Sequence, residues 1–171
     1  MTLEQELLTG FNCVAEPSAR ILILGSMPGV KSIEEQQYYA HPRNTFWKII
    51  EVIFQIPHDK EYHQRLECLK QQRVALWDVV HQCVRPGSLD ADIQSASVQV
   101  NDFKALFEYA PGIEAVFFNG AKAADLYKKK VMKEDFEQNS KRRYVQLPST
   151  SPANAAMSLA KKLDIWQQIK G

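Results

Sequence analysis

The sequence predicts an α/β protein, a three-layer α/β/α sandwich built around a four-stranded and mainly parallel central sheet. The first observation is a set of four short apolar runs, each about the length of one buried strand. The second is that helical patterns separate these runs, an alternation typical of parallel sheets covered by helices on both faces. The third is size, since 171 residues that are 45% hydrophobic suit one full core, and we expect residues 1–171 to form a single domain. The predicted strands are Ile21–Gly25, Val74–Trp77, Ala115–Asn119 and Tyr144–Leu147.

Amphipathic patterns predict the helices between and around these strands. At the N-terminus, Thr2 is followed three residues later by Gln5, a spacing typical of a capping box that would open a first helix. The pattern nearest the C-terminus is the clearest. The apolar positions at helical spacing are Phe46, Trp47, Ile49, Ile50, Ile53 and Phe54, then Phe103, Leu106 and Phe107, and finally Ala155, Leu159, Leu163, Trp166 and Ile169, with a further helix expected at Ala121–Lys130.

Charge and composition narrow the function classes. A formal net charge of +1 neither requires nor forbids a polyanionic partner, so binding to DNA would depend on local patches. The widely spaced Cys13, Cys68 and Cys83 indicate neither a disulfide framework nor a structural metal site, and we expect no metal and no cofactor. No apolar stretch approaches the roughly 20 residues that span a bilayer, and the acidic N-terminal segment is unlike a secretory signal. We therefore expect a cytoplasmic monomer without membrane contact.

Two segments are predicted to be exposed loops, Arg85–Ser88 and Lys128–Arg143. The second contains seven basic residues. A solvated loop explains such a run, and a patch that faces phosphates is the alternative.

The loop Gly25–Gly29 interrupts the first predicted strand at its carboxyl end, where open α/β sheets bind ligands. In a structural interpretation the glycines supply turn geometry and Met27 packs inward. In a functional interpretation the small residues let a base and its sugar approach the backbone at Ser26 and Met27. The glycine spacing of a dinucleotide-binding motif or a P-loop is absent. Asp78, at the end of the second predicted strand, is either a turn residue or an anchor or base beside this loop.

The segment Tyr38–Asn44 contains two tyrosines, a histidine, an arginine and an asparagine. Asn44 precedes the helix that begins near Phe46, so helix capping is its structural explanation, and Tyr39 is equally explained as a core aromatic. Alternatively, the tyrosines offer a flat face to a base that has left the DNA stack. His41 is the one histidine inside this segment, and the four histidines show no metal-ligand spacing.

The segment Leu147–Asn154 joins the fourth predicted strand to the last helix. Ser151 at an N-cap and Pro152 at the first helical position explain it structurally. The hydroxyls of Ser149, Thr150 and Ser151, with unpaired amides at a helix N-terminus, also form an anion site that a DNA phosphate would fit.

Taken in order, these segments resemble the uracil-DNA glycosylase superfamily over most of the chain, from about Ile21 to Gly171. Mismatch-specific uracil/thymine glycosylases carry Gly-Ile-Asn-Pro-Gly, Phe-Ala-His-Pro, Asn-x-Phe-Trp, a strand ending in Phe-Asn-Gly and a Pro-Ser-Ser-Ser loop. The corresponding stretches here are Gly25–Gly29, Tyr39–Pro42, Asn44–Trp47, Phe118–Gly120 and Leu147–Ser151. Each match is weak alone, and together in the right order they are specific. The resemblance implies a uracil-DNA glycosylase-like fold.

One departure indicates the branch of this superfamily. Met27 stands where most relatives have the asparagine that positions the hydrolytic water, and a thioether orients water poorly. The sequence is more similar to the hypoxanthine-DNA glycosylase branch, in which the asparagine of His-Pro-Arg-Asn, here Asn44, takes over that duty. This resemblance implies a monofunctional DNA repair glycosylase that removes a deaminated base, above all hypoxanthine, from DNA.

The resemblance also implies a role for each candidate residue. Asn44 assisted by His41 would orient water, the set Ser26, Met27, Tyr39 and Asp78 would hold the flipped base, and the set Ser149, Thr150, Ser151 and Asn154 would contact DNA. The alternatives are a glycosylase directed to uracil or a mismatch, an inactive protein that binds damaged DNA, and a hydrolase of small nucleotides.

Overall fold

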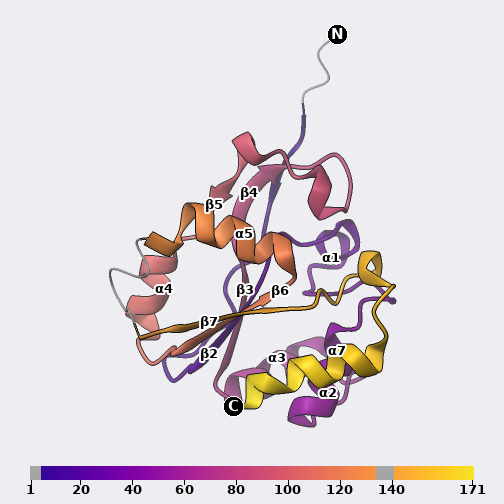
Figure 1. Ribbon diagram of the computed structural model, residues 1–171, viewed down its shortest axis with the longest axis vertical. Coiled ribbons are helices and arrows are strands. Elements are labelled where there is room, and N and C mark those ends of the chain that lie inside the picture. Colours follow the sequence, from indigo (N-terminus) through magenta and orange to yellow (C-terminus); the bar gives the residue numbers. More distant parts are fainter. Residues whose placement is uncertain (1–4, 134–140) are drawn as a thin grey trace.

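The computed structural model describes residues 5–133 and 141–171, and its centre is a four-stranded parallel sheet (Figure 1). The strand order is β3-β2-β6-β7, and each pair of neighbouring strands is parallel. The strands are β2 (Ile21–Gly25), β3 (Val74–Asp78), β6 (Ala115–Asn119) and β7 (Arg143–Leu147). The predicted sheet is confirmed, with β3 and β7 each one residue longer than expected.

The register of this sheet brings the carboxyl ends of its strands to one edge. Gly25 pairs with Asp78 across β2 and β3, and Asn119 pairs with Leu147 across β6 and β7. Because parallel strands point the same way, the loops that follow them begin side by side. The predicted ligand loops therefore start at a common edge.

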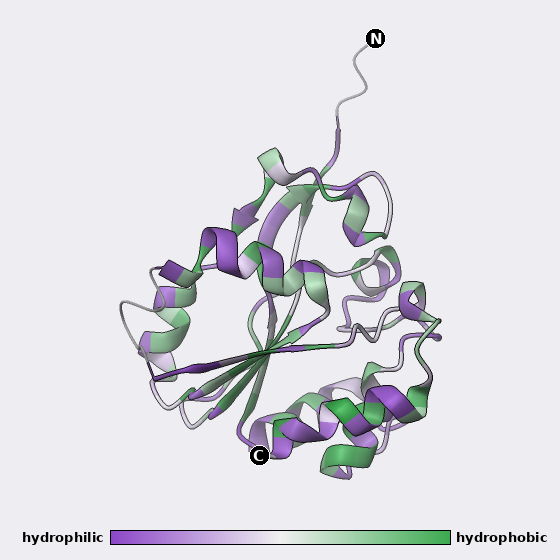
Figure 2. Ribbon diagram, viewed as in Figure 1, coloured by the Kyte–Doolittle hydropathy of each residue, from purple (hydrophilic) through white to green (hydrophobic). Residues whose placement is uncertain are grey.

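Helices cover both faces of the sheet. On one face, α2 (Phe46–Phe54), α3 (Tyr62–Gln71) and α7 (Leu159–Trp166) pack over Ile23 and Phe117 (Figure 1). Successive side chains of a strand point to opposite faces of the sheet, so the residues next to Ile23 and Phe117 in their strands point toward the helices on the other face. Figure 2 shows mainly hydrophobic strands at the centre and helices that carry hydrophilic and hydrophobic residues together.

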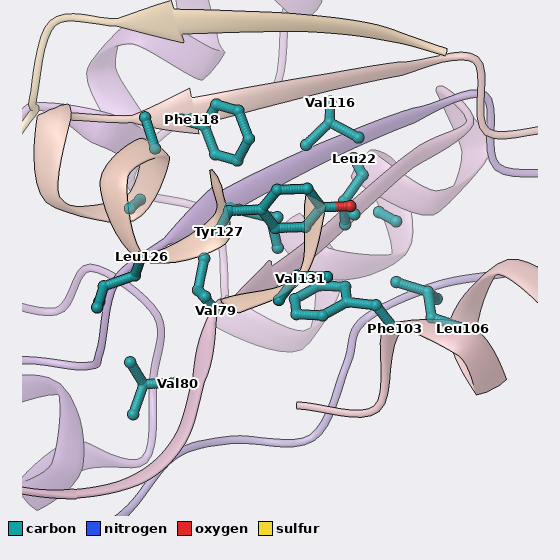
Figure 3. Close-up of a cluster of buried hydrophobic side chains, with 14 of the residues drawn as sticks. Leu22, Val79, Val80, Phe103, Leu106, Val116, Phe118, Leu126, Tyr127 and Val131 are labelled. Atoms are coloured by element: carbon teal, nitrogen blue, oxygen red, sulfur yellow. The ribbon is translucent and has the colours of Figure 1, made fainter. Parts of the chain in front are cut away.

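The second face is covered by α4 (Phe103–Tyr109) and α5 (Ala121–Lys130). Its apolar cluster is organised around the ring of Tyr127, whose centroid lies 5.2 Å from that of Phe118 and 5.3 Å from that of Phe103 (Figure 3). With helices on both sides, the predicted three-layer sandwich is confirmed.

The N-terminal segment, where a first helix was predicted, forms a strand of a second, antiparallel sheet. β1 (Leu7–Thr9) pairs with β4 (Val80–Val84), and β4 pairs with β5 (Gln99–Val100). The predicted first helix is wrong in the described part of this segment, and Thr2 lies outside the described residues. Short isolated helices are marginal in water, so the ladder of hydrogen bonds to β4 outweighs the weak helical pattern.

Two arginines in segments that were predicted to be exposed loops are buried instead. Arg85, in the segment 85–88 that was expected to be exposed, is 4% exposed and donates from Nη2 to the Pro28 carbonyl oxygen at 2.7 Å. Arg142 is also buried and donates from Nε to the Ile113 carbonyl oxygen at 3.1 Å. Both guanidinium groups bind backbone carbonyls inside the fold, so neither forms part of a solvated loop or an exposed phosphate patch.

Short elements complete the described chain. They are α1 (Val30–Glu35), η1 (Asp90–Asp92), η2 (Ser95–Ser97), η3 (Pro152–Asn154) and η4 (Gln167–Lys170). Ser158 caps the last long helix, so Ser151, which was expected to cap it, caps η3 instead. Of the predicted basic loop, residues 128–130 end α5, and residues 134–140 lie outside the described residues. Within the described ranges, no helix has the length and apolarity needed to cross a membrane.

Candidate active site

Hydrogen bonds join the loops at the carboxyl edge of the sheet. Thr45, just before α2, donates from its backbone N to the Thr150 carbonyl oxygen at 3.1 Å. Asn119, at the end of β6, donates from Nδ2 to Thr150 Oγ1 at 3.0 Å and accepts from the Thr150 backbone N at 2.9 Å. Thr150 is 1% exposed. The loop after β7 is thus held against the segment that carries Asn44, and Thr150 supports this junction from inside.

The remaining polar residues of this loop are only partly buried. Ser149 Oγ accepts from the Ser151 backbone N at 3.1 Å, and Ser151 Oγ accepts from the Ala153 backbone N at 3.2 Å. Asn154 donates from Nδ2 to the Ser149 carbonyl oxygen at 3.1 Å. A hydroxyl that accepts a backbone hydrogen bond keeps its own O–H as a donor. Ser149 and Ser151 can therefore donate to a phosphate oxygen while the loop stays folded.

Asn44 is held at the start of α2 by two hydrogen bonds. Its backbone N donates to the His41 carbonyl oxygen at 2.9 Å, and its Oδ1 accepts from the Phe46 backbone N at 3.0 Å. Thr45 occupies the formal N-cap position, but the Asn44 side chain makes the cap-like bond. Because an amide oxygen has two lone pairs, Oδ1 can accept a second hydrogen bond from water. The structural and the catalytic interpretation of Asn44 are therefore compatible.

Tyr39 combines a stacked ring, an unfavourable backbone conformation and a buried hydroxyl. Its ring stacks on Phe46, with centroids 4.1 Å apart and planes at 28°. Its φ of 57° lies in the left-handed region, which is uncommon for a non-glycine residue. Its hydroxyl makes no hydrogen bond of good geometry among the described residues. Burial raises its pKa well above the ordinary value, and the nearby Asn119 side chain opposes that rise. Backbone strain of this kind persists only where the surrounding packing imposes it, and it is concentrated at functional sites.

A cavity of about 150 Å³ lies beside Asn44. Tyr39, His41 and Asn44 all line it, so the structure brings these predicted residues together. The Arg43 backbone N donates to His41 Nδ1 at 3.1 Å, which leaves the proton of a neutral imidazole on Nε2. The rest of the lining is Gln37, Ala40, Pro42, Trp47, Lys48, His58 and Arg65.

The other predicted base-binding residues are buried and do not line this cavity. Ser26 donates from Oγ to Asp90 Oδ1 at 2.5 Å. Met27 is 6% exposed and packs inward in the apolar cluster beneath α4 and α5. The structural interpretation of Met27 therefore describes this protein without bound DNA. The loop residues Ser149, Thr150, Ser151 and Asn154 do not line the cavity either.

Asp78 is a buried carboxyl with a pKa near neutrality. It is 3% exposed, and its Oδ2 has no hydrogen-bond partner in the described part of the chain. The pKa of Asp78 is raised to about 7, chiefly by burial and in addition by the charge of Asp90, while Arg85 acts in the opposite direction. A Cβ added to Gly25 would lie 2.4 Å from Asp78 Oδ1 and 2.9 Å from Tyr39 Oη. The Asp78 carboxyl and the Tyr39 hydroxyl thus occupy the space that a side chain at position 25 would need, and this close approach requires glycine.

The fold and the match to a known family together identify an α/β protein of the DNA glycosylase class. The family model of the uracil DNA glycosylase superfamily matches residues 13–170. The chain belongs to this superfamily.

Similar proteins agree with this assignment. A hypoxanthine DNA glycosylase of Methanosarcina acetivorans is 35% identical over 161 residues, which is 94% of this chain and 96% of the relative. A hypoxanthine DNA glycosylase of Methanosarcina barkeri is 39% identical over 117 residues, 68% of this chain and 73% of the relative. A solution NMR structure from Methanosarcina acetivorans, described as a candidate uracil DNA glycosylase, has a TM-score of 0.78 and 32% identity. That match covers 97% of this chain and 100% of the other, so the predicted superfamily and fold are confirmed.

Sequence reasoning missed several residues around the site. Lys48, His58 and Arg65 line the cavity, but none belongs to a recognised motif and nothing in the sequence distinguishes them from the other basic residues, so no sequence signal selects them. Asn119 ends a strand motif that resembles the family, and its position at a strand end was a usable signal for its bond to Thr150. Across the described residues, no group of three or more His, Cys, Asp or Glu side chains is placed to share a metal ion.

Proposed function

We propose that this protein is a monofunctional DNA glycosylase that removes hypoxanthine from DNA, acting as one domain and one monomer without a cofactor. The observation that carries the proposal is the cavity that the ring of Tyr39 and the amide of Asn44 line together. The two relatives named as hypoxanthine DNA glycosylases support the choice of base.

Binding begins at the DNA backbone. The hydroxyls of Ser149 and Ser151, with Asn154 and the buried support of Thr150, contact phosphates and set the position of the DNA without reading its sequence. The damaged nucleotide then rotates out of the stack, at a cost of a few kcal/mol that is smallest for a poorly paired base. Hypoxanthine pairs poorly with thymine, so selection begins before the base reaches the cavity.

The extruded base stacks on Tyr39, an interaction worth about 1–3 kcal/mol. The backbone at Ser26 and Met27 and the carboxyl of Asp78 meet the polar edge of the base. Because these three residues do not line the cavity of the free protein, their contact with the base requires the Tyr39 side chain to move away from Gly25.

Hydrolysis then depends on Asn44. Its Oδ1 accepts a hydrogen bond from water and directs that water at C1′ of the deoxyribose, with His41 assisting from the same cavity. The C1′–N bond breaks through an oxocarbenium-like state and its electron pair leaves with the base. The water oxygen bonds to C1′, and the proton that this water loses is taken up by the departing base. The products are free hypoxanthine and an abasic site. The buried thioether of Met27 takes no part in orienting water, which is why this duty falls to Asn44.

The test is a single-turnover assay on labelled duplexes that carry deoxyinosine, deoxyuridine, deoxyxanthosine or a mismatched thymine, with abasic sites revealed by alkali. We expect the deoxyinosine strand to react fastest. Absence of abasic sites on every substrate would favour an inactive damage-binding protein, and faster reaction of uracil would reassign the substrate. Lys48 lines the cavity, so borohydride trapping is the direct check for lyase chemistry, and we expect no covalent protein–DNA product.

A further inference from the structure

A basic wall lines part of the cavity beside Asn44. Lys48, His58 and Arg65 contribute to it in addition to His41, and no Asp or Glu of the described chain lines the same cavity. These residues come from α2, from the segment between α2 and α3, and from α3. Cationic groups that converge on a cavity without carboxylates raise the local concentration of anions there.

Arg65 is held in place before any ligand arrives. Its Nε donates to the Lys60 carbonyl oxygen at 2.9 Å. Its guanidinium carbon lies 4.5 Å from the ring centroid of Trp47 and 5.4 Å from that of Tyr62. A planar guanidinium held against aromatic rings keeps its remaining N–H groups for an acceptor, and its fork geometry matches two oxygens of a phosphate.

The acidic residues close to this wall are already engaged. Glu51 pairs with His58 Nδ1, and the Glu61 carboxylate accepts hydrogen bonds from two backbone N atoms in the first turn of α3. Neither Lys48 nor Arg65 forms an ion pair within residues 5–133 and 141–171. His58 is thus already paired, and Glu61 lies near enough to oppose the lowering of the Arg65 pKa by burial. No carboxylate pairs directly with Lys48 or Arg65 in these ranges, however, so these two cations are the part of the wall that can bind a ligand.

We propose that Lys48 and Arg65 form a phosphate subsite that binds the DNA phosphate adjoining the flipped nucleotide. The inference rests on the proposed glycosylase function and goes beyond it by assigning residues outside the predicted site. Because Asn44 lines the same cavity, a nucleotide whose C1′ faces the amide has its own flanking phosphates within reach of these cations. The wall would then hold the sugar in place while Tyr39 holds the base.

The proposal is tested by removing the charge from one phosphate at a time. Duplexes carry an abasic tetrahydrofuran analogue, which cannot be hydrolysed, with an uncharged methylphosphonate on its 5′ or its 3′ side. Fluorescence anisotropy gives the affinity. We expect the protein to lose about tenfold or more in affinity at one of the two positions. Arg65→Gln and Lys48→Gln should each bind the unmodified duplex more weakly, and the slope of log affinity against log salt concentration should be smaller in magnitude by about 0.9. Each variant should lose much less affinity than the unmodified protein when the methylphosphonate is placed at the sensitive position. Equal losses in the protein and in both variants would overturn the proposal.

Controls separate the alternatives. Lys104→Gln, at an exposed position on α4 across the sheet, should bind like the unmodified protein. If circular dichroism shows that Arg65→Gln does not fold, Lys48→Gln at its exposed position decides the outcome.

Inorganic phosphate and deoxyinosine 5′-monophosphate serve as free competitors. Tight binding of the monophosphate without a methylphosphonate effect would overturn the assignment of the subsite to a DNA phosphate. If the protein releases hypoxanthine but shows no methylphosphonate effect, only the phosphate subsite is refuted. If it neither binds the abasic duplex nor releases a base, the glycosylase proposal itself is refuted.

Discussion

Replacing Asp78 by Asn should change how the stability of the protein depends on pH. The native pKa of Asp78, raised to about 7 by burial and by Asp90, lies well above the ordinary value of 3.8 for an unfolded chain. Between these values the native state binds more protons than the unfolded state, so the free energy of unfolding falls as the pH rises. The stability that protonated Asp78 allows is thus complete below about pH 4 and lost above about pH 7.

The magnitude follows from the two pKa values. At about 1.4 kcal/mol per pKa unit, this carboxyl alone lowers the free energy of unfolding by about 2 to 3 kcal/mol between pH 5 and pH 8. The amide of Asp78→Asn has nearly the same shape and carries no charge, so its stability relative to the unmodified protein should increase by that amount over the same interval.

Urea unfolding followed by tryptophan fluorescence at pH 5, 6, 7 and 8 measures this difference. Asp164→Asn, at an exposed position on α7, is the matched control and should follow the unmodified protein at every pH. If the stability curves of Asp78→Asn and the unmodified protein stay parallel from pH 5 to pH 8, Asp78 is already ionised in the native state. The reasoning from its burial would then be wrong.

Three further substitutions test the site. Asn44→Ala should lower the single-turnover rate of base release roughly 100-fold or more, with an unchanged circular dichroism spectrum, because the water is no longer oriented. Tyr39→Ala should weaken binding of deoxyinosine DNA by about 1–3 kcal/mol in anisotropy titrations, and equal affinity would remove Tyr39 from base stacking. Gly25→Ala should cost about 1–3 kcal/mol in urea unfolding and slow base release, since its Cβ would overlap Asp78 Oδ1 at 2.4 Å. Gly29→Ala is the control, because a Cβ there meets nothing within 4 Å.

The main sheet was predictable because each of its strands is a continuous apolar run between turn signals. The small sheet was not, because β1 and β5 contain only three and two residues and carry no periodic pattern. Only Val79 separates β3 from β4, so no turn signal in the sequence marks the point where the chain passes from one sheet to the other.

The candidate site divides in the same way. Tyr39, His41 and Asn44 lie close together in sequence, so a local motif was enough to predict that they lie close together in space, and all three line one cavity. The cations that line the same cavity depend on how α3 packs against α2, and the inward packing of Met27 depends on the cluster beneath α4 and α5. Such long-range packing leaves no short sequence signal.

The N-terminal segment has one more consequence, at the outer side of β3. β3 lies at one end of the strand order, and Val14 closes part of its free edge, donating to the Leu76 carbonyl oxygen at 3.0 Å and accepting from the Leu76 N at 2.8 Å. An uncovered edge strand is a template for pairing between molecules. Shortening the chain past residue 15 would therefore uncover this edge, and we expect the shortened protein to self-associate through β3 even with every residue around Asn44 intact.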